Sequence, residues 1–477
     1  MKKKFYITAA IPYVNADPHI GHALEFIQTD TIKRYYTLMH YDSKSLSGGD
    51  ENALKNVQAA EKRGISTKKF VDQNTELFRK LAVALDAEFD FWQKGSDQKH
   101  HFPAVQKLWN LCKKDIYKKT YKGLYCVGCE AFYTKGELNE NGECLEHPGK
   151  KLEEVEEENY FFKLKNYKEK LTKLINSDRL KIIPEKRKHE VLSFLNKGLE
   201  DISISRSNKR AKNWGVPVPG DQSQKIYVWF DALNIYQSGI GFGWDDSTYT
   251  KYWPADVHVI GKGILRFHAI YWPAFLLSAG LKLPKKIFVH EYFTVNGQKM
   301  SKSIGNVVDP FELINRFGKD PLRYYFLAKF SPFSDGDYSD DKFIEAYNSD
   351  LANGLGNLLS RVAKMAEGYS FGKFFGYKKS ETSEVLVEFG KKYEFDKVLA
   401  LIWNKIASCN QYINEKKVWE LKGKEREKHL FYLINTIKQI AFDLIPFLPE
   451  TAGKIDEQFK GPVIKPNKPL FPRLKQT

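Results

Sequence analysis

Two short polar stretches, far apart in the chain, constrain its fold more than any other feature. They are Pro18-His19-Ile20-Gly21-His22 and Lys299-Met300-Ser301-Lys302-Ser303. His19 and His22 are three residues apart, so both imidazole rings share one face if the segment is helical. Asp17 suits an N-cap and Pro18 a first helical residue, which predicts a helix start just before the histidines. A helix N-terminus with two imidazole donors suits an anion, and Gly21 leaves room between the rings.

The second stretch supplies cations. Lys299 and Lys302 flank small residues and follow Asn296-Gly297, a pair typical of a tight turn. A basic loop after such a turn can close over a triphosphate and neutralise charge as it develops. Taken singly, a His-x-x-His pair also occurs in cores and on surfaces, and a lysine-serine loop is commonly just solvated. Together, in this order and with an α/β-sized region between them, they predict a polyphosphate site.

The hydrophobic pattern predicts a doubly wound, Rossmann-type α/β domain made of residues 1–112 and 225–300. Strands are expected at Phe5–Ile11 and Ser43–Gly49, with a helical period over 18–39 between them. The alternation resumes with expected strands at Ile226–Phe230, Val257–Ile260 and Ile287–His290 and a helix from about residue 264. Ligands of such sheets bind at the carboxyl ends of the strands, which is where both motifs fall.

Residues 113–224 break the alternation and are expected to be an insertion that splits the α/β domain. Cys126-x-x-Cys129 and Cys144-x-x-His147 within it have the spacing of two zinc knuckles. Four ligands with no open position predict one structural Zn²⁺ that stabilises a small, core-poor insertion. A set of buried or oxidised thiols is the alternative. Beyond about residue 340, long helical stretches at 343–366 and 428–447 replace the strands, so 341–477 are expected to form a helical bundle.

Composition narrows the partners and the compartment. The net charge is +16, from 75 Lys and Arg against 59 Asp and Glu, which favours a nucleic-acid partner. A lysine-rich proteome would produce the same surplus. No apolar run approaches the roughly 20 residues of a membrane span, and Pro12, Asn15 and Asp17 interrupt any signal-peptide core. Five cysteines in so long a chain do not suggest a secreted disulfide framework. We therefore expect a cytoplasmic protein without a membrane partner, in which Cys112 and Cys409 are ordinary buried thiols.

The two opening motifs are similar to the HIGH and KMSKS signatures of class I aminoacyl-tRNA synthetases, and both match without a substitution. Further stretches narrow the resemblance to the methionyl-tRNA synthetase family: Ala9–Asn15, Tyr227–Tyr236, Gly261-Lys262, Phe267-His268, Trp272–Ala274 and Phe288–Tyr292. The likeness runs from about residue 4 to the end of the chain.

The resemblance implies an ATP- and Mg²⁺-dependent ligase that makes methionyl-adenylate and passes the methionyl group to the terminal adenosine of tRNA(Met), the initiator included. His19, His22, Lys299 and Lys302 would be catalytic, and Gly21, Gly261 and Ser301 would join them in binding ATP. The family's methionine pocket falls on Ala10, Ile11, Tyr13, Asp50, Trp229, Ala232, Tyr236, Ile264 and His290. A thioether favours polarizable aromatic walls, and Asp50 can pair with the substrate ammonium. Without the family, Trp229 reads equally well as a core residue.

Two positions depart from the family pattern. Gly263 stands where a carboxylate usually holds the ATP ribose, and Asn52-Ala53 stand where His-Gly usually follows the pocket's Asp-Glu pair. Either ATP affinity is expected to be weaker, or Glu51 and backbone groups substitute at the ribose.

The resemblance also implies a stem-contact region with the lysine loop at 301–340 and an anticodon site in the helical region. Asn357, Arg361 and Trp419 match the residues that read the anticodon, and loop bases are read by stacking and by Asn or Arg hydrogen bonds. A solvated Asn/Arg face and a core tryptophan are the alternative.

Two rival functions stay open: a sister class I synthetase for another aliphatic amino acid, and a catalytically silent paralogue that binds tRNA. Longer members of the family dimerise through an appended oligonucleotide-binding domain, and this chain has only a few residues after Pro472. A monomer is therefore expected.

Overall fold

The structure, a computed structural model, describes residues 2–126, 131–133, 135–146, 149, 151–300, 305–371 and 383–475. Two compact units divide the chain. The first unit comprises Met1–Pro18, Asp42–Val83 and Ala87–His290, and the second comprises His19–Tyr41, Ala84–Asp86 and Glu291–Thr477. Among the described residues, no helix has both the length and the apolar character needed to cross a membrane.

A six-stranded parallel sheet is the centre of the first unit. Its strands, in spatial order, are β3 (Phe91–Lys94), β2 (Asp42–Gly49), β1 (Lys4–Ala9), β12 (Val257–Gly261), β13 (Lys286–His290) and β7 (Lys181–Ile183). Every residue of β12 is buried, as expected for a central strand covered on both faces. The strands predicted near residues 5, 43, 257 and 287 are confirmed, and the α/β fold with them.

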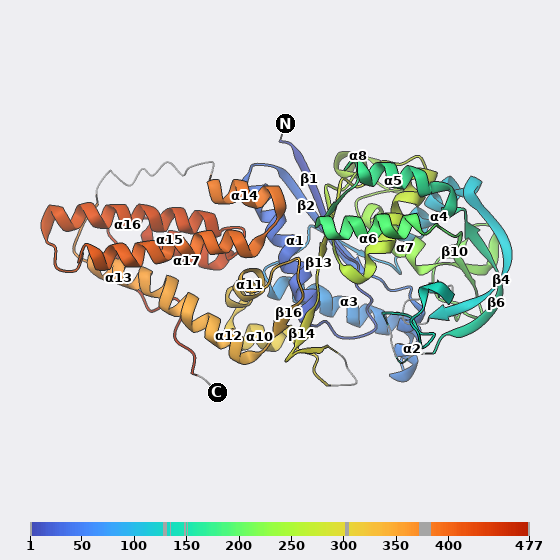
Figure 1. Ribbon diagram of the computed structural model, residues 1–477, viewed down its shortest axis with the longest axis horizontal. Helices are drawn as coiled ribbons and strands as arrows, with labels where there is room; N and C mark the ends of the chain where they lie inside the picture. The colour runs from blue at the N-terminus through green and yellow to red at the C-terminus, as the bar shows by residue number, and fades with distance from the viewer. Residues whose placement is uncertain are drawn as a thin grey trace. The chain divides into compact units, whose positions relative to one another are not determined.

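Helices and two antiparallel sheets complete the first unit (Figure 1). The helices are α2 (Leu54–Lys62), α3 (Thr67–Ala84), α4 (His101–Leu111), α5 (Lys168–Asn176), α6 (Glu185–Asn196), α7 (Val228–Ser238), α8 (Asp246–Tyr252) and α9 (Trp272–Ser278). One antiparallel sheet has the order β5 (Ala131–Tyr133), β4 (Ile116–Cys126), β6 (Glu153–Phe162), β8 (Ile202–Ser203). The other has the order β10 (Pro217–Val218), β11 (Asp221–Ile226), β9 (Ser205–Ser207).

The strand predicted at Ile226–Phe230 is wrong. Strand β11 ends at Ile226, and Val228 begins helix α7, of which every residue is buried. A helix buried on all sides has the same continuous apolar run as a buried strand, so its sequence alone does not separate the two.

The predicted insertion at 113–224 also differs from the structure in its middle. Strand β7 pairs in parallel with β13 and extends the main sheet, although it lies between the antiparallel strands in sequence. Its three residues are too short to give a recognisable pattern. Helix α1 (Ile20–Leu38), expected in the α/β domain, belongs to the second unit.

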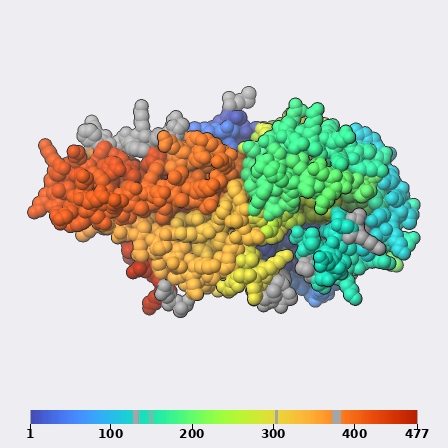
Figure 2. Space-filling model, in the orientation of Figure 1, coloured from blue at the N-terminus to red at the C-terminus, as the bar shows by residue number. Residues whose placement is uncertain are grey.

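The second unit is mostly helical. After α1 its helices are α10 (Pro310–Phe317), α11 (Lys319–Ala328), α12 (Asp340–Ala346), α13 (Asn357–Ala366), α14 (Glu384–Lys392), α15 (Phe395–Glu415), α16 (Gly423–Leu444) and α17 (Pro449–Phe459). A π-helical stretch, Tyr347–Gly356, joins α12 to α13. A small sheet has the order β15 (Gln298–Lys299), β14 (Phe293–Val295), β16 (Gly336–Tyr338). The predicted long helices are confirmed, and α13 to α17 form a continuous surface in Figure 2.

A buried arginine joins the helices of the second unit. Arg323 on α11 is fully buried and lies 2.8 Å from the Asp30 carboxylate of α1. It also donates to the Phe447 and Pro446 carbonyls, ahead of α17. A buried guanidinium needs such a full set of acceptors, and here these bonds fix α1 against the bundle.

Candidate active site

The two histidines form the first turn of α1 in a way that the sequence did not indicate. The helix begins at Ile20, and His19 is its N-cap: the His19 Nδ1 accepts from the Gly21 N–H at 3.1 Å, and the His22 Nδ1 accepts from the His19 N–H at 3.2 Å. The predicted start at Asp17 and Pro18 is therefore wrong. An imidazole replaces the usual carboxylate or hydroxyl cap, and Asp17 instead lies 3.5 Å from Arg63.

This capping sets the chemistry of both rings. Because each Nδ1 is an acceptor, the proton of the neutral ring is on Nε2, so Nε2 is the donor nitrogen. The centroids of the His19 and His22 rings are 4.0 Å apart, so the two rings lie side by side as their spacing predicts. A Cβ on Gly21 would come within 2.9 Å of the His19 Cε1, so any side chain there would displace that ring.

The second motif follows a hairpin of β14 and β15. Asn296 and Gly297 form its two-residue turn, both with positive φ, as the Asn-Gly pair predicts. The structure brings this hairpin to the start of α1: the Met300 Cε lies 3.9 Å from where a Cβ on Gly21 would be, and the Ile20 N–H donates to the Val308 carbonyl at 3.3 Å. The Asn306 side chain donates to the Lys299 carbonyl at 3.2 Å. Ser301 and Lys302 lie outside the described residues.

The proposed methionine residues lie together in the first unit. Ala10, Ile11 and Tyr13 follow β1, Asp50 follows β2, and Ile264 and His290 come from the ends of the β12 and β13 segments. Gly261, assigned to ATP, is the last residue of β12. All are at the carboxyl edge of the parallel sheet, where ligands of doubly wound folds bind.

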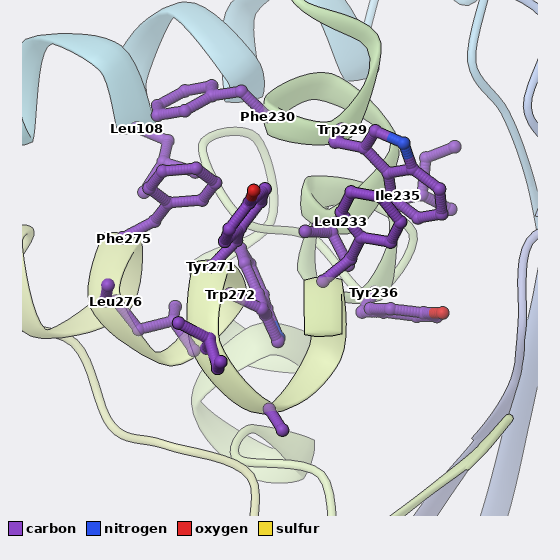
Figure 3. Close-up of a cluster of buried hydrophobic side chains, with 14 of the residues drawn as sticks. Leu108, Trp229, Phe230, Leu233, Ile235, Tyr236, Tyr271, Trp272, Phe275 and Leu276 are labelled. Atoms are coloured by element: carbon purple, nitrogen blue, oxygen red, sulfur yellow. The ribbon is translucent and has the colours of Figure 1, made fainter. Parts of the chain in front are cut away.

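Helix α7 supplies the aromatic wall of this group. The Trp229 ring lies edge-on to Tyr13 with centroids 6.1 Å apart, and it stacks on Phe267 at 3.7 Å. Figure 3 shows Trp229 and Tyr236 on one side of the helix, with Phe230 directed toward Leu108 and Phe275. Trp229 is thus packed like a core residue and also lies beside Tyr13, so it combines the two roles that the sequence analysis gave as alternatives.

The Tyr236 hydroxyl is part of a chain of hydrogen-bonded buried groups. The Tyr236 hydroxyl donates to the His268 Nε2 at 2.7 Å, while the His268 Nδ1 donates to the Ile264 carbonyl at 2.9 Å. Burial lowers the pKa of His268 to about 4 and holds the pKa of His258, stacked on Tyr236, well below its ordinary range. These histidines therefore stay neutral in the folded protein.

The neutral histidines make the pocket sensitive to acid. Unfolding returns His268 to an ordinary pKa near 6.5, so between pH 6.5 and about 4 the unfolded chain binds more protons. We expect the free energy of unfolding to fall as the pH is lowered through this window. Urea unfolding at several pH values would measure it, and His268→Gln should give a shallower pH dependence than the wild type. Equal slopes would contradict the assignment.

Asp50 is placed by its backbone. Its side chain is buried, its N–H donates to the Pro12 carbonyl at 2.9 Å, and its carbonyl accepts from the Asn56 side chain at 2.8 Å. Residues Tyr13 and Asp50 pair as an isolated β-bridge. Asp50 is thus fixed beside the aromatic residue that faces Trp229.

The Glu51 carboxylate, expected as one substitute at the ribose, has partners within the first unit. This buried carboxylate accepts from the Thr75 hydroxyl at 2.5 Å and from the N–H and hydroxyl of Ser96 at 3.0 and 2.5 Å. Both oxygens are therefore occupied inside the first unit.

Several residues of this site were not predicted as such. Phe267 and His268 contact Trp229 and Tyr236 from a π-helical turn, Phe267–Tyr271, that precedes α9. Turns of this kind frequently occur at functional sites. The sequence signal for them was the Phe267-His268 pair itself, which is one of the stretches that carry the family resemblance.

The predicted anticodon residues share one surface of the second unit. Trp419 is 45 % exposed, and the Arg361 guanidinium lies 5.7 Å from the centre of its ring. Arg361 also donates to the Asn414 side chain at 2.7 Å, and Asn357 donates to Asn410 at 3.4 Å. At this exposure Trp419 is not a core residue.

Two of the four predicted zinc ligands are described. The sulfur atoms of Cys126 and Cys144 lie 3.2 Å apart and are buried. This separation exceeds a disulfide bond and is close enough for both to bind one ion. Cys129 and His147 lie outside the described residues, and no group of three or more possible ligands occurs within them. Cys112 and Cys409 are buried, as predicted.

The parallel sheet, the histidine-capped helix and the lysine hairpin define a class I aminoacyl-tRNA synthetase. Residues 5–363 match the profile of the family described as tRNA synthetases class I (M). The chain belongs to that family, the methionyl branch.

Named relatives agree over nearly the whole chain. Methionine–tRNA ligase of Thermotoga maritima is 40 % identical over 95 % of this chain and 74 % of its own length. That of Mycobacterium tuberculosis is 40 % identical over 95 % of this chain and 91 % of its own. The structure of the Mycobacterium tuberculosis methionyl-tRNA synthetase in complex with methionyl-adenylate aligns with a TM-score of 0.89 at 35 % identity, covering 99 % of this chain and all of that one.

Proposed function

We propose that this chain activates L-methionine with ATP and transfers the methionyl group to the 3′-terminal adenosine of tRNA(Met). The carboxylate of methionine attacks the α-phosphorus of Mg²⁺-bound ATP, a P–O bond forms, and pyrophosphate leaves. The protein contributes position and charge rather than covalent chemistry. The observation that supports the amino acid assignment best is the group of Tyr13, Trp229 and Tyr236 beside the buried Asp50.

We assign the residue roles as follows. The Nε2 donors of His19 and His22 hydrogen-bond the triphosphate at the positive end of α1. Lys299 and Lys302 neutralise the pyrophosphate as it leaves. The aromatic side chains contact the thioether, and the Asp50 carboxylate pairs with the ammonium group.

Methionine-dependent exchange of pyrophosphate into ATP tests the first step. We expect exchange with methionine and much less with leucine, isoleucine or valine. A preference for one of these would indicate a sister synthetase, and no exchange with any amino acid would indicate a silent paralogue.

Recognition of tRNA is proposed to depend on Trp419. Trp419→Ala should lower kcat/KM for tRNA charging by about 5- to 150-fold, the loss of one stacked base at 1–3 kcal/mol, while pyrophosphate exchange stays unchanged. Leu401→Ala is the matched control, because Leu401 is 44 % exposed in the same bundle. Equal losses in charging and exchange for Trp419→Ala would make it a structural residue.

One structural Zn²⁺ is proposed on Cys126, Cys129, Cys144 and His147. Metal analysis should find one zinc per wild-type chain, and Cys126→Ser should lose it because a tetrahedral site needs all four ligands. Cys112→Ser, a buried thiol bonded to the Phe275 carbonyl, should keep it. A wild-type zinc content well below one per chain would contradict the site.

A monomer in the cytoplasm remains our prediction for the state of the protein. Light scattering at micromolar concentration should give a mass near 55.3 kDa. A mass twice as large that persists on dilution would contradict it.

A further inference from the structure

Helix α7 has two faces with different tasks. Trp229, Ala232 and Tyr236 follow one another at helical spacing and form the proposed methionine wall. Asp231 is two residues after Trp229, and Ser238 is two residues after Tyr236. Two residues correspond to a rotation of about 200° around the helix axis, so Asp231 and Ser238 lie on the opposite face of α7. Both are buried, at 1 % and 0 % exposure.

A single histidine spans this back face. The His101 Nε2 lies 2.5 Å from the Asp231 carboxylate, and its Nδ1 lies 2.7 Å from the Ser238 hydroxyl. The carboxylate accepts from Nε2, and Nδ1 shares a hydrogen bond with the Ser238 hydroxyl. His101, on α4, is completely buried. It contacts two positions seven residues apart and therefore restrains both the rotation and the axial position of α7.

Asn52 connects this network to the segment that carries Asp50. Its Nδ2 donates to the second oxygen of Asp231 at 2.6 Å and to the Gly95 carbonyl at 2.7 Å. The Trp214 indole donates to the carbonyl of Glu51 between them at 2.8 Å. The Asn52–Asp231 hydrogen bond therefore connects the segment that carries Asp50, the proposed ligand of the substrate ammonium, directly to helix α7, which carries Trp229 and Tyr236.

We propose that Asn52 and His101 are positioning residues for methionine: acting through Asp231, they set the distance between the Asp50 carboxylate and the Trp229 and Tyr236 rings. Neither residue touches the substrate. The inference rests on the proposed function of the pocket.

The expected result is a change in methionine affinity that ATP does not share. Asn52→Ala should raise KM for methionine by about tenfold or more, the loss of a hydrogen bond to a charged group. KM for ATP and kcat should stay within about twofold, because the variant weakens methionine binding equally in the ground state and in the transition state. His101→Ala should act in the same direction.

Conservative variants separate positioning from general stability. His101→Gln keeps a donor at the ε position and Asn52→His restores the residue usual in the family, so both should recover most of the methionine affinity. Asn208→Ala is the matched control, since Asn208 makes a similar bond to the Gln222 carbonyl at 2.6 Å elsewhere in the unit. If the alanine variants do not fold, Asn52→Asp replaces them, because it keeps the shape of the side chain but removes the donor to Asp231, and methionine quenching of tryptophan fluorescence should show the same loss of affinity.

Each outcome has one meaning. An unchanged methionine KM in Asn52→Ala, or an equal rise in KM for ATP, overturns the proposal. Absence of methionine-dependent exchange in the wild type would instead remove the proposed function itself.

Discussion

Asp50→Asn should nearly abolish the use of methionine while leaving the fold intact. Removing one partner of a buried, hydrogen-bonded charge pair costs about 2–5 kcal/mol, or about 30- to several-thousand-fold in kcat/KM. Asparagine has the same shape and keeps an acceptor, and the bonds that fix Asp50 come from its backbone. Pyrophosphate exchange at varied methionine concentration measures the loss.

The control for this prediction is another carboxylate of the same unit. Asp221 in β11 accepts from Ser223 and Tyr160, and Asp221→Asn should leave KM for methionine unchanged. If Asp50→Asn kept wild-type kcat/KM, the ammonium of the substrate would have to bind elsewhere.

Lys302→Ala should slow adenylate formation without weakening methionine binding. Removal of one preorganised electrostatic donor costs about 2.7–4 kcal/mol, or about 10²–10³ in kcat. In the sequence Lys302 follows the β14–β15 hairpin, and the Met300 Cε lies 3.9 Å from where a Cβ on Gly21 would be. Single-turnover formation of methionyl-adenylate is the measurement.

Lys391→Ala, a surface lysine paired with Glu388, serves as the control for lost positive charge. Adenylate formation at the wild-type rate in Lys302→Ala would show that its ammonium group does not act in the transition state.

The sequence predicted β1, β12 and β13 well because each is a short, largely apolar run. The positions of Asp50, Tyr13 and His290 followed, since strand ends in a doubly wound sheet meet at one edge. The same reasoning failed for α7, where continuous burial removed the alternation that identifies a surface helix. Strand β7 was missed because three residues carry no period.

Hydrogen-bond partners that are far apart in the chain could not be predicted from the sequence, for a different reason. The hydrogen bonds of the Glu51 carboxylate with Thr75 and Ser96 could not be read from the sequence. The network of Asn52, His101, Asp231 and Ser238 joins residues up to 179 positions apart. Only the tertiary fold decides which buried polar groups satisfy one another.

The reciprocal cap at the start of α1 requires the Nδ1 atoms of both histidines to be unprotonated, because each accepts a backbone hydrogen bond. A proton added at either Nδ1 would give the ring a positive charge and so a stronger pull on a triphosphate. The same proton would turn an acceptor into a donor, leave the Gly21 or His19 N–H without its bond, and loosen the first turn that aims both rings. The aim of both rings thus depends on unprotonated Nδ1 atoms, and in the proposed function the histidines would bind phosphate through directed hydrogen bonds while the lysines supply the full charges.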